Sequence, residues 1–133
     1  MNRLSMISAI SLALLIAACT HSKSASNDWR AGGLYSTADG KGRFSVVKIL
    51  VLEPNAVHVR LYKQRFSSRP TSVDPASLTL GQLNDKDSFS IGHLPLSKAS
   101  FASWGPVFIS QQSISDDELE GYKTRKEAKG GVF

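Results

Sequence analysis

Three histidines and one cysteine are the side chains of this chain best suited to chemistry near neutral pH. A nucleophilic site would need a histidine base beside a serine. Neither His58 nor His93 is accompanied by a Gly-x-Ser-x-Gly motif or a comparable spacing. Each of these two histidines lies in a β-rich segment, so we interpret both as structural. We therefore expect a non-catalytic protein rather than a hydrolase.

The same side chains form no pattern typical of a metal or phosphate site. The histidines are scattered, and neither zinc-ligand spacing nor an EF-hand loop is present. Asp85-Lys86-Asp87 is too short to predict a calcium site, and Gly40-Lys41-Gly42 is most simply a turn. We expect no metal and no cofactor.

Cys19 ends an apolar run that begins at Leu4, directly after the positive charge of Arg3. This order is typical of a signal peptide. The run is shorter than the roughly 18 to 20 residues that a membrane-spanning helix needs. Residues 1–18 are therefore predicted to be a cleaved leader. A plain secretory leader, cleaved at an Ala-x-Ala-like site near Ala18, is the alternative.

The segment Ile16-Ala17-Ala18-Cys19 resembles the lipobox of bacterial lipoproteins. The resemblance implies cleavage before Cys19 and a diacylglycerol on its thiol. It also implies sorting to the periplasmic face of the outer membrane, because Thr20 stands where an aspartate would retain a lipoprotein at the inner membrane. Since several acyl chains anchor a protein far more stably than one, we expect the membrane to be a partner through Cys19.

Removal of residues 1–18 would leave 115 of the 133 residues and lower the formal charge from +5 to +4. That length is typical of one domain. Residues 19–28 are small and polar and are predicted to form the acylated cysteine and a flexible tether. Residues 29–133 would then form a single globular domain. With no second cysteine, that domain has no internal disulfide.

The strongest structural signal is a β-hairpin. Two β-rich runs, 43–52 and 57–62, flank the turn sequence Glu53-Pro54-Asn55-Ala56. The first run is apolar on both faces, which favours a central strand covered on both sides. The second run alternates between apolar and polar residues, which favours a half-exposed strand.

Shorter signals complete an α+β fold. Three further strands are expected, over residues 32–37, 89–94 and 107–110. The second of these should end before Pro95. Ser97 should cap a short helix that ends at Trp104, and Ser115 with Glu118 forms a capping box for a C-terminal helix. We predict a small antiparallel sheet of about four to six strands with both helices packed on one face.

Positive charge is concentrated in the hairpin and just after it. Residues 41–69 contain seven lysines and arginines against a single acid, Glu53. The predicted partner-binding face consists of Arg43, His58, Arg60, Tyr62, Lys63 and Arg65. Such a face suits an acidic protein, anionic head groups or another polyanion, whereas nucleic acid is not expected in the periplasm. A solvated basic face near an anionic membrane is the alternative.

The size, the lipobox and the lack of a catalytic motif are together similar to small lipoprotein immunity proteins encoded beside secreted antibacterial toxins. This resemblance in kind implies a non-catalytic module that binds and neutralises a toxin. The alternative is a structural or assembly lipoprotein of an envelope or secretion machine, or a cell-wall-binding accessory.

Overall fold

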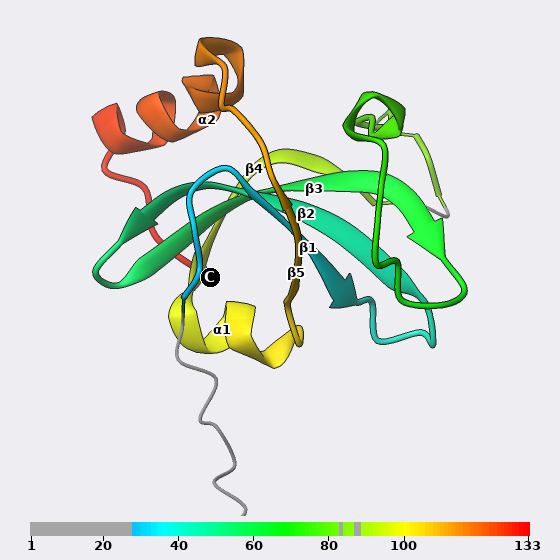
Figure 1. The fold of residues 1–133 in the computed structure, drawn as a ribbon. Helices are drawn as coiled ribbons and strands as arrows, with labels where there is room; N and C mark the ends of the chain where they lie inside the picture. The colour runs from blue at the N-terminus through cyan, green and yellow to red at the C-terminus, as the bar shows by residue number, and fades with distance from the viewer. Residues whose placement is uncertain (1–27, 83, 87–88) are drawn as a thin grey trace, which may run out of the picture.

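The computed structural model describes residues 28–133 except residues 83, 87 and 88. Its strands form one antiparallel sheet in the order β4-β3-β2-β1-β5 (Figure 1). The strands are β1 (Gly33–Ala38), β2 (Phe44–Glu53), β3 (Ala56–Phe66), β4 (Ile91–Ser97) and β5 (Val107–Gln111). The helices are α1 (Lys98–Ser103), α2 (Asp116–Glu127) and the 3₁₀ turn η1 (Pro75–Ser77). The predicted α+β class with an antiparallel sheet is confirmed.

The predicted hairpin forms the centre of the sheet. Glu53 pairs with Ala56, so Pro54 and Asn55 make the connecting turn between β2 and β3. The first four strands form a meander, and β5 then crosses to the free side of β1. The hairpin is therefore flanked by a strand on each side.

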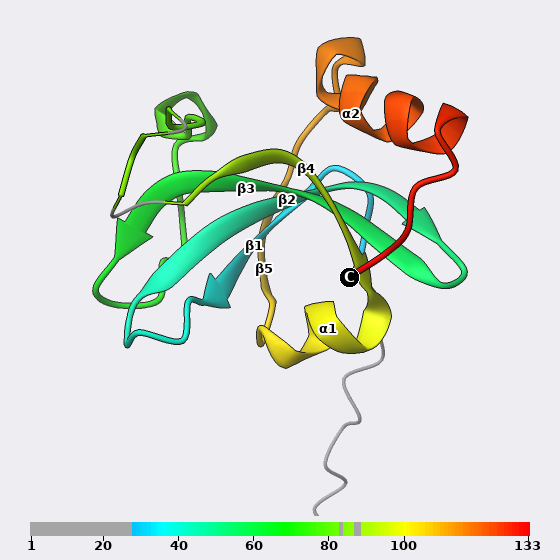
Figure 2. The ribbon, with the colours of Figure 1, turned by 180° about the vertical axis from the view of Figure 1, so that it is seen from behind.

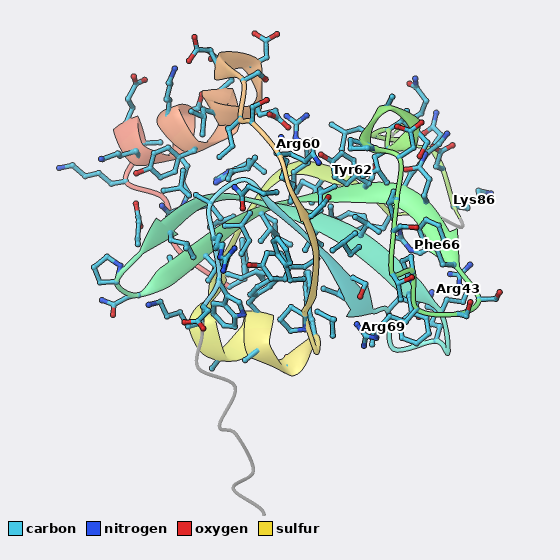
Figure 3. All side chains as sticks on the ribbon, viewed as in Figure 1. Arg43, Arg60, Tyr62, Phe66, Arg69 and Lys86 are labelled. Carbon is cyan, nitrogen blue, oxygen red and sulfur yellow. The ribbon has the colours of Figure 1, made fainter. Side chains whose placement is uncertain are left out.

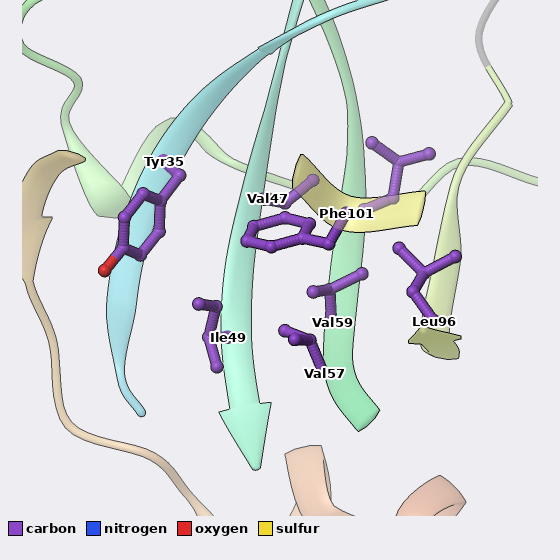
Figure 4. Close-up of a cluster of buried hydrophobic side chains, with 8 residues drawn as sticks. Tyr35, Val47, Ile49, Val57, Val59, Leu96 and Phe101 are labelled. Carbon is purple, nitrogen blue, oxygen red and sulfur yellow. The ribbon is translucent and has the colours of Figure 1, made fainter. Parts of the chain in front are cut away.

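Helix α1 covers one face of the hairpin. Phe101 of α1 is fully buried and packs on Val47, Ile49, Val57 and Val59 (Figure 4). The Ser97 hydroxyl accepts a hydrogen bond from the backbone N–H of Ser100, as predicted for the start of this helix. The alternating apolar residues of β2 and β3 thus supply one continuous core layer.

The opposite face carries a second core and a different helix. Leu34, Val46, Tyr62 and Leu78 pack together there, beneath the loop that carries η1. Figures 1 and 2 show α2 on this side of the sheet and α1 on the other. The prediction that both helices pack on one face of the sheet is therefore wrong. Because β2 is apolar on both faces, each face requires its own cover.

A buried ion pair attaches α2 to the sheet. Lys48 of β2 is only 5% exposed, and its Nζ lies 2.9 Å from Glu118 Oε1 and 2.5 Å from the Ser113 carbonyl oxygen. Glu118 also accepts a hydrogen bond from the Ser115 backbone N–H at 2.8 Å, which confirms the predicted capping box. The start of α2 is therefore held at the middle of β2 by polar contacts.

Strand β4 differs from its prediction at both ends. It begins at Ile91 rather than at Phe89, and it continues through Pro95 to Ser97. Proline is tolerated because β4 is an edge strand. Its outer edge pairs with the end of the chain, since Phe133 N donates to the Pro95 carbonyl at 2.9 Å and Ser97 N donates to the Phe133 carbonyl at 2.6 Å.

Replacing Phe101 by alanine should lower the free energy of unfolding by about 3–5 kcal/mol, because the ring fills the core between α1 and the hairpin. Phe89→Ala is the matched control. That side chain is 62% exposed, so its removal should change stability by no more than about 0.5 kcal/mol. Urea denaturation measures the free energy of unfolding of both variants. Equal losses of stability in the two variants would contradict the placement of α1.

Candidate functional site

The structure separates the six residues that were predicted to form one partner-binding face. His58 is fully buried and Tyr62 is 8% exposed. Burial raises the pKa of Tyr62 to about 12, and the charge of Glu118 adds to the effect. The prediction of a half-exposed strand is therefore wrong for this part of β3. Helix α2 and the loop carrying η1 cover the face that the alternation pattern assigned to solvent.

Arg60 and Lys63 also lie apart from Arg43. Arg60 is half-buried on the α2 side of the sheet, and its Nε donates to the Gly92 carbonyl at 3.3 Å. Lys63 is half-buried further along β3. Figure 3 shows Arg43 and Lys86 together toward one end of the sheet, away from Arg60. Of the predicted set, Arg43 and Arg65 line one cavity and Arg60 and Tyr62 line another, so the six residues do not form one face.

Arg43 and Arg65 line a cavity of about 290 Å³ where β1 and β3 end and β2 begins. Two further cations, Lys41 and Lys86, line it, against one carboxylate, Asp39. The remaining wall residues are Thr37, Ala38, Ser45, Leu61, Phe89 and Trp104. We name this the cationic cavity. Its charge and its aromatic rings suit an anionic group attached to an apolar stem.

Asp39 fixes the position of Arg43. Its carboxylate accepts hydrogen bonds from the backbone N–H groups of Lys41 and Arg43, at 2.7 and 3.0 Å, and from Arg43 Nε at 3.1 Å. Desolvation opposes the charge of Asp39, but these bonds outweigh it and hold its pKa below the usual value. The terminal nitrogens Nη1 and Nη2 of Arg43 have no hydrogen-bond partner among the described residues.

Arg65 is held by backbone carbonyl groups. Its Nη1 donates to the carbonyls of Tyr62 and Gln64, at 2.7 and 3.1 Å, and its Nη2 donates to that of Phe89 at 2.5 Å. Burial and the nearby charge of Arg43 both lower the pKa of Arg65 from its usual value. Two like charges are thus fixed near each other, an arrangement that a bound anion would stabilise.

Two other cations of the basic segment serve the fold. Lys48 pairs with Glu118, as described above. Arg69 donates to the carbonyl groups of Ser36 and Gly105, and its guanidinium lies 4.8 Å from the centroid of the Phe44 ring. Neither is free to meet a partner, so the charge count of the sequence overstates the available positive surface.

A second cavity, of about 540 Å³, lies between the sheet and the start of α2. It is polar, and its lining includes Lys48, Arg60, Tyr62, Ser115 and Glu118. Lys48 is neutralised by Glu118 at 2.9 Å. The cationic cavity, by contrast, carries an excess of positive charge, and we take it as the candidate site.

Of the residues that line the cationic cavity, only Arg43 and Arg65 were predicted as site residues from the sequence. Lys86 and Phe89 lie in the loop before β4, about twenty positions after Arg65. Trp104 is half-buried, packs against Phe101 at a centroid distance of 6.4 Å and also lines the cavity. In the sequence, only the combination of a basic turn and a following aromatic residue could have indicated that Lys86 and Phe89 belong to the site.

The two described histidines meet beneath α2. His58 Nδ1 lies 2.9 Å from His93 Nε2, and the two rings are nearly parallel. His58 Nε2 lies 3.2 Å from Glu53 Oε2 without hydrogen-bond alignment, and Tyr122 Oη donates to Glu53 Oε1 at 2.9 Å. A Cβ at Gly121 would come within 2.5 Å of the His93 Cβ, so α2 lies directly on this cluster. Such close cover leaves no room for a substrate between them.

The histidine cluster predicts a loss of stability in acid. Burial lowers the pKa of His58 and lowers that of His93 to about 4, with smaller contributions from the charge of Arg125. Both rings are neutral in the folded protein but titrate near 6.5 when unfolded. Stability is therefore full above that pH and is lost as the pH falls toward 4. Below about 4.5 the lowered pKa of Glu53, caused first by the hydrogen bond from Tyr122 and then by the neighbouring His58, acts in the same direction.

The free energy of unfolding should fall by about 2 kcal/mol between pH 7 and pH 4.5. His93→Gln should flatten this dependence, whereas His21→Gln, in the predicted tether, should leave it unchanged. Urea denaturation at several pH values measures the slopes. If stability depends on pH equally in His93→Gln and in the parent chain, the histidine cluster is not the cause of the acid sensitivity.

Cys19, the predicted lipidation site, lies outside the described residues. Within residues 28–133, apart from the three omitted positions, no helix is long and apolar enough to cross a membrane. The described part of the chain also contains no group of three histidine, cysteine or acidic residues that could hold a metal ion. Comparisons with protein-family models, curated proteins and solved structures found no match.

Proposed function

We propose that the chain is a lipid-anchored, non-catalytic binding module of the outer membrane, and that it neutralises a secreted antibacterial toxin as an immunity protein. The observation that carries this proposal is the cationic cavity, in which four cations face one carboxylate beside an exposed aromatic ring. An acidic surface of the toxin would dock there. Inhibition would then follow from occupation of the toxin surface rather than from chemistry.

The composition of this surface matches that of a protein-binding site. Arginine and aromatic residues are the types that most often dominate binding energy at interfaces. Phe89 is 62% exposed, and its carbonyl accepts a hydrogen bond from Arg65. Exposure of a large aromatic ring to water is unfavourable, and a bound partner would cover it. The excess positive charge would steer an acidic partner and accelerate its association.

The location rests on the resemblance of residues 16–19 to a lipobox. A lipid on Cys19 would hold the domain at the membrane, so that it meets a toxin as the toxin enters the periplasm. The chain enters the domain at Trp29, whose ring packs 4.8 Å from the Phe101 ring of α1. The attachment point is therefore on the α1 side of the sheet, and Trp104, at the end of that helix, lines the cationic cavity.

A structural or assembly role in an envelope machine is the second candidate, and the observation that favours it is the edge strand β5. Val107 and Phe108 of this strand are 49% and 44% exposed. An exposed apolar edge can accept a further strand from another chain. This role predicts an envelope or secretion defect on deletion instead of toxin sensitivity.

Replacing Cys19 by serine should abolish incorporation of labelled palmitate and release the protein from the membrane pellet, because the thiol is the predicted acyl acceptor. Ser22→Ala, in the same polar segment, should retain both. An unlabelled and soluble parent chain would instead support the plain secretory leader.

A deletion strain should lose in competition with its parent siblings, and the intact gene should restore survival. Lys41→Glu/Lys86→Glu should fail to restore it, because the variant removes the positive charge that attracts the toxin. Lys98→Glu/Lys123→Glu makes the same charge change at exposed helical positions and should protect fully.

Thermal unfolding of both double variants should match the parent chain, since exposed charges contribute little to stability. Undiminished survival of the deletion strain would refute the immunity role. Equal protection by the two double variants would move the docking surface away from the cationic cavity.

A further inference from the structure

We infer that the cationic cavity is a receptor for a single side-chain carboxylate of the partner, and that Arg43 is the residue that recognises it. The inference rests on the proposed function for the identity of the partner. It adds the chemical group that enters the cavity and the atoms that bind it.

The volume of the cavity limits what can enter. It is about 290 Å³, at the lower end of the roughly 300–1,000 Å³ typical of small-molecule sites. One glutamate or aspartate side chain fits within such a space. The cavity therefore suits one inserted side chain at the centre of a larger contact.

Arg43 presents the donors that a carboxylate needs. Asp39 occupies its Nε at 3.1 Å, and two backbone N–H groups hold that carboxylate in turn. The guanidinium is thus oriented before a ligand arrives, with Nη1 and Nη2 unoccupied by any described residue. Two parallel N–H donors in one plane match the two oxygens of a carboxylate.

The charges around the cavity favour a bound anion. Arg65 is fixed near Arg43 by three carbonyl groups, so the two guanidinium groups repel each other until an anion lies between or beside them. Asp39 already places one carboxylate at the edge. The four cations of the lining outnumber this carboxylate, so the cavity still attracts an anion.

The rest of the lining suits the stem of an acidic side chain. Leu61 and Trp104 provide apolar walls, and Phe89 stands at the exposed side. Thr37 and Ser45, 1% and 3% exposed, complete the lining. A methylene stem can pack on the rings while its carboxylate meets Arg43.

The test is an NMR titration of the full lipidated chain in detergent micelles. The probe is N-acetyl-glutamate N-methylamide, which carries one side-chain carboxylate, and the neutral probe is its glutamine counterpart. Saturable shifts of the Arg43 Nε–H and Trp104 indole signals are expected with the glutamate probe and none with the glutamine probe. Arg43→Lys keeps the charge but loses the two parallel N–H donors of the guanidinium, so it should weaken binding about tenfold. Lys123→Gln should not weaken binding.

No saturable shift with the glutamate probe, or equal shifts with both probes, would overturn the inference. Tighter binding of inorganic phosphate, unaffected by Arg43→Lys, would overturn the carboxylate assignment in favour of a phosphate site. Sibling competition separates this inference from the proposed function. Protection by a chain that does not bind the glutamate probe would refute the inference alone, whereas probe binding without any protection would refute the immunity role alone.

Discussion

The structure depends on the need to cover both faces of the central hairpin. Val46 and Val47 are adjacent in β2 and both fully buried, one in each core. No single layer can satisfy this alternation, so α1 packs on one face while α2 and the loop carrying η1 pack on the other. The ion pair of Lys48 with Glu118 then fixes where α2 begins. A charged pair this buried is costly to break, which makes the position of α2 well defined.

This arrangement also decides which polar residues reach solvent. Helix α2 covers His58, which forms a buried cluster with His93 beneath the helix. On the other face, α1 ends at Ser103 and leaves Trp104 beside the ends of β1 and β3. The cationic cavity forms at this point, because Arg43 directly precedes β2, Arg65 belongs to β3, and Ser45 of β2 pairs directly with Arg65. The proposed binding site therefore lies where the cover of the sheet ends.

The sequence predicted local features well and side-chain exposure poorly. The β2–β3 hairpin, the Ser97 cap and the Ser115–Glu118 capping box depend on neighbouring residues, and all three are confirmed. The exposure of His58 depends instead on α2, more than fifty positions away, which no alternation pattern reveals. Lys86 and Phe89 likewise join Arg65 only through tertiary folding. Arg43 and Arg65 were predicted because both belong to the basic hairpin segment, residues 41–69.

We propose that an acidic partner inserts one carboxylate into the cationic cavity. A crystal structure of the full chain bound to the toxin of its own strain tests this most directly. We expect a partner aspartate or glutamate with both oxygens within about 3 Å of Arg43 Nη1 and Nη2, and its stem beside Trp104. A partner seated on the edge of β5, or on the polar cavity at the start of α2, with the cationic cavity open to solvent, would contradict it.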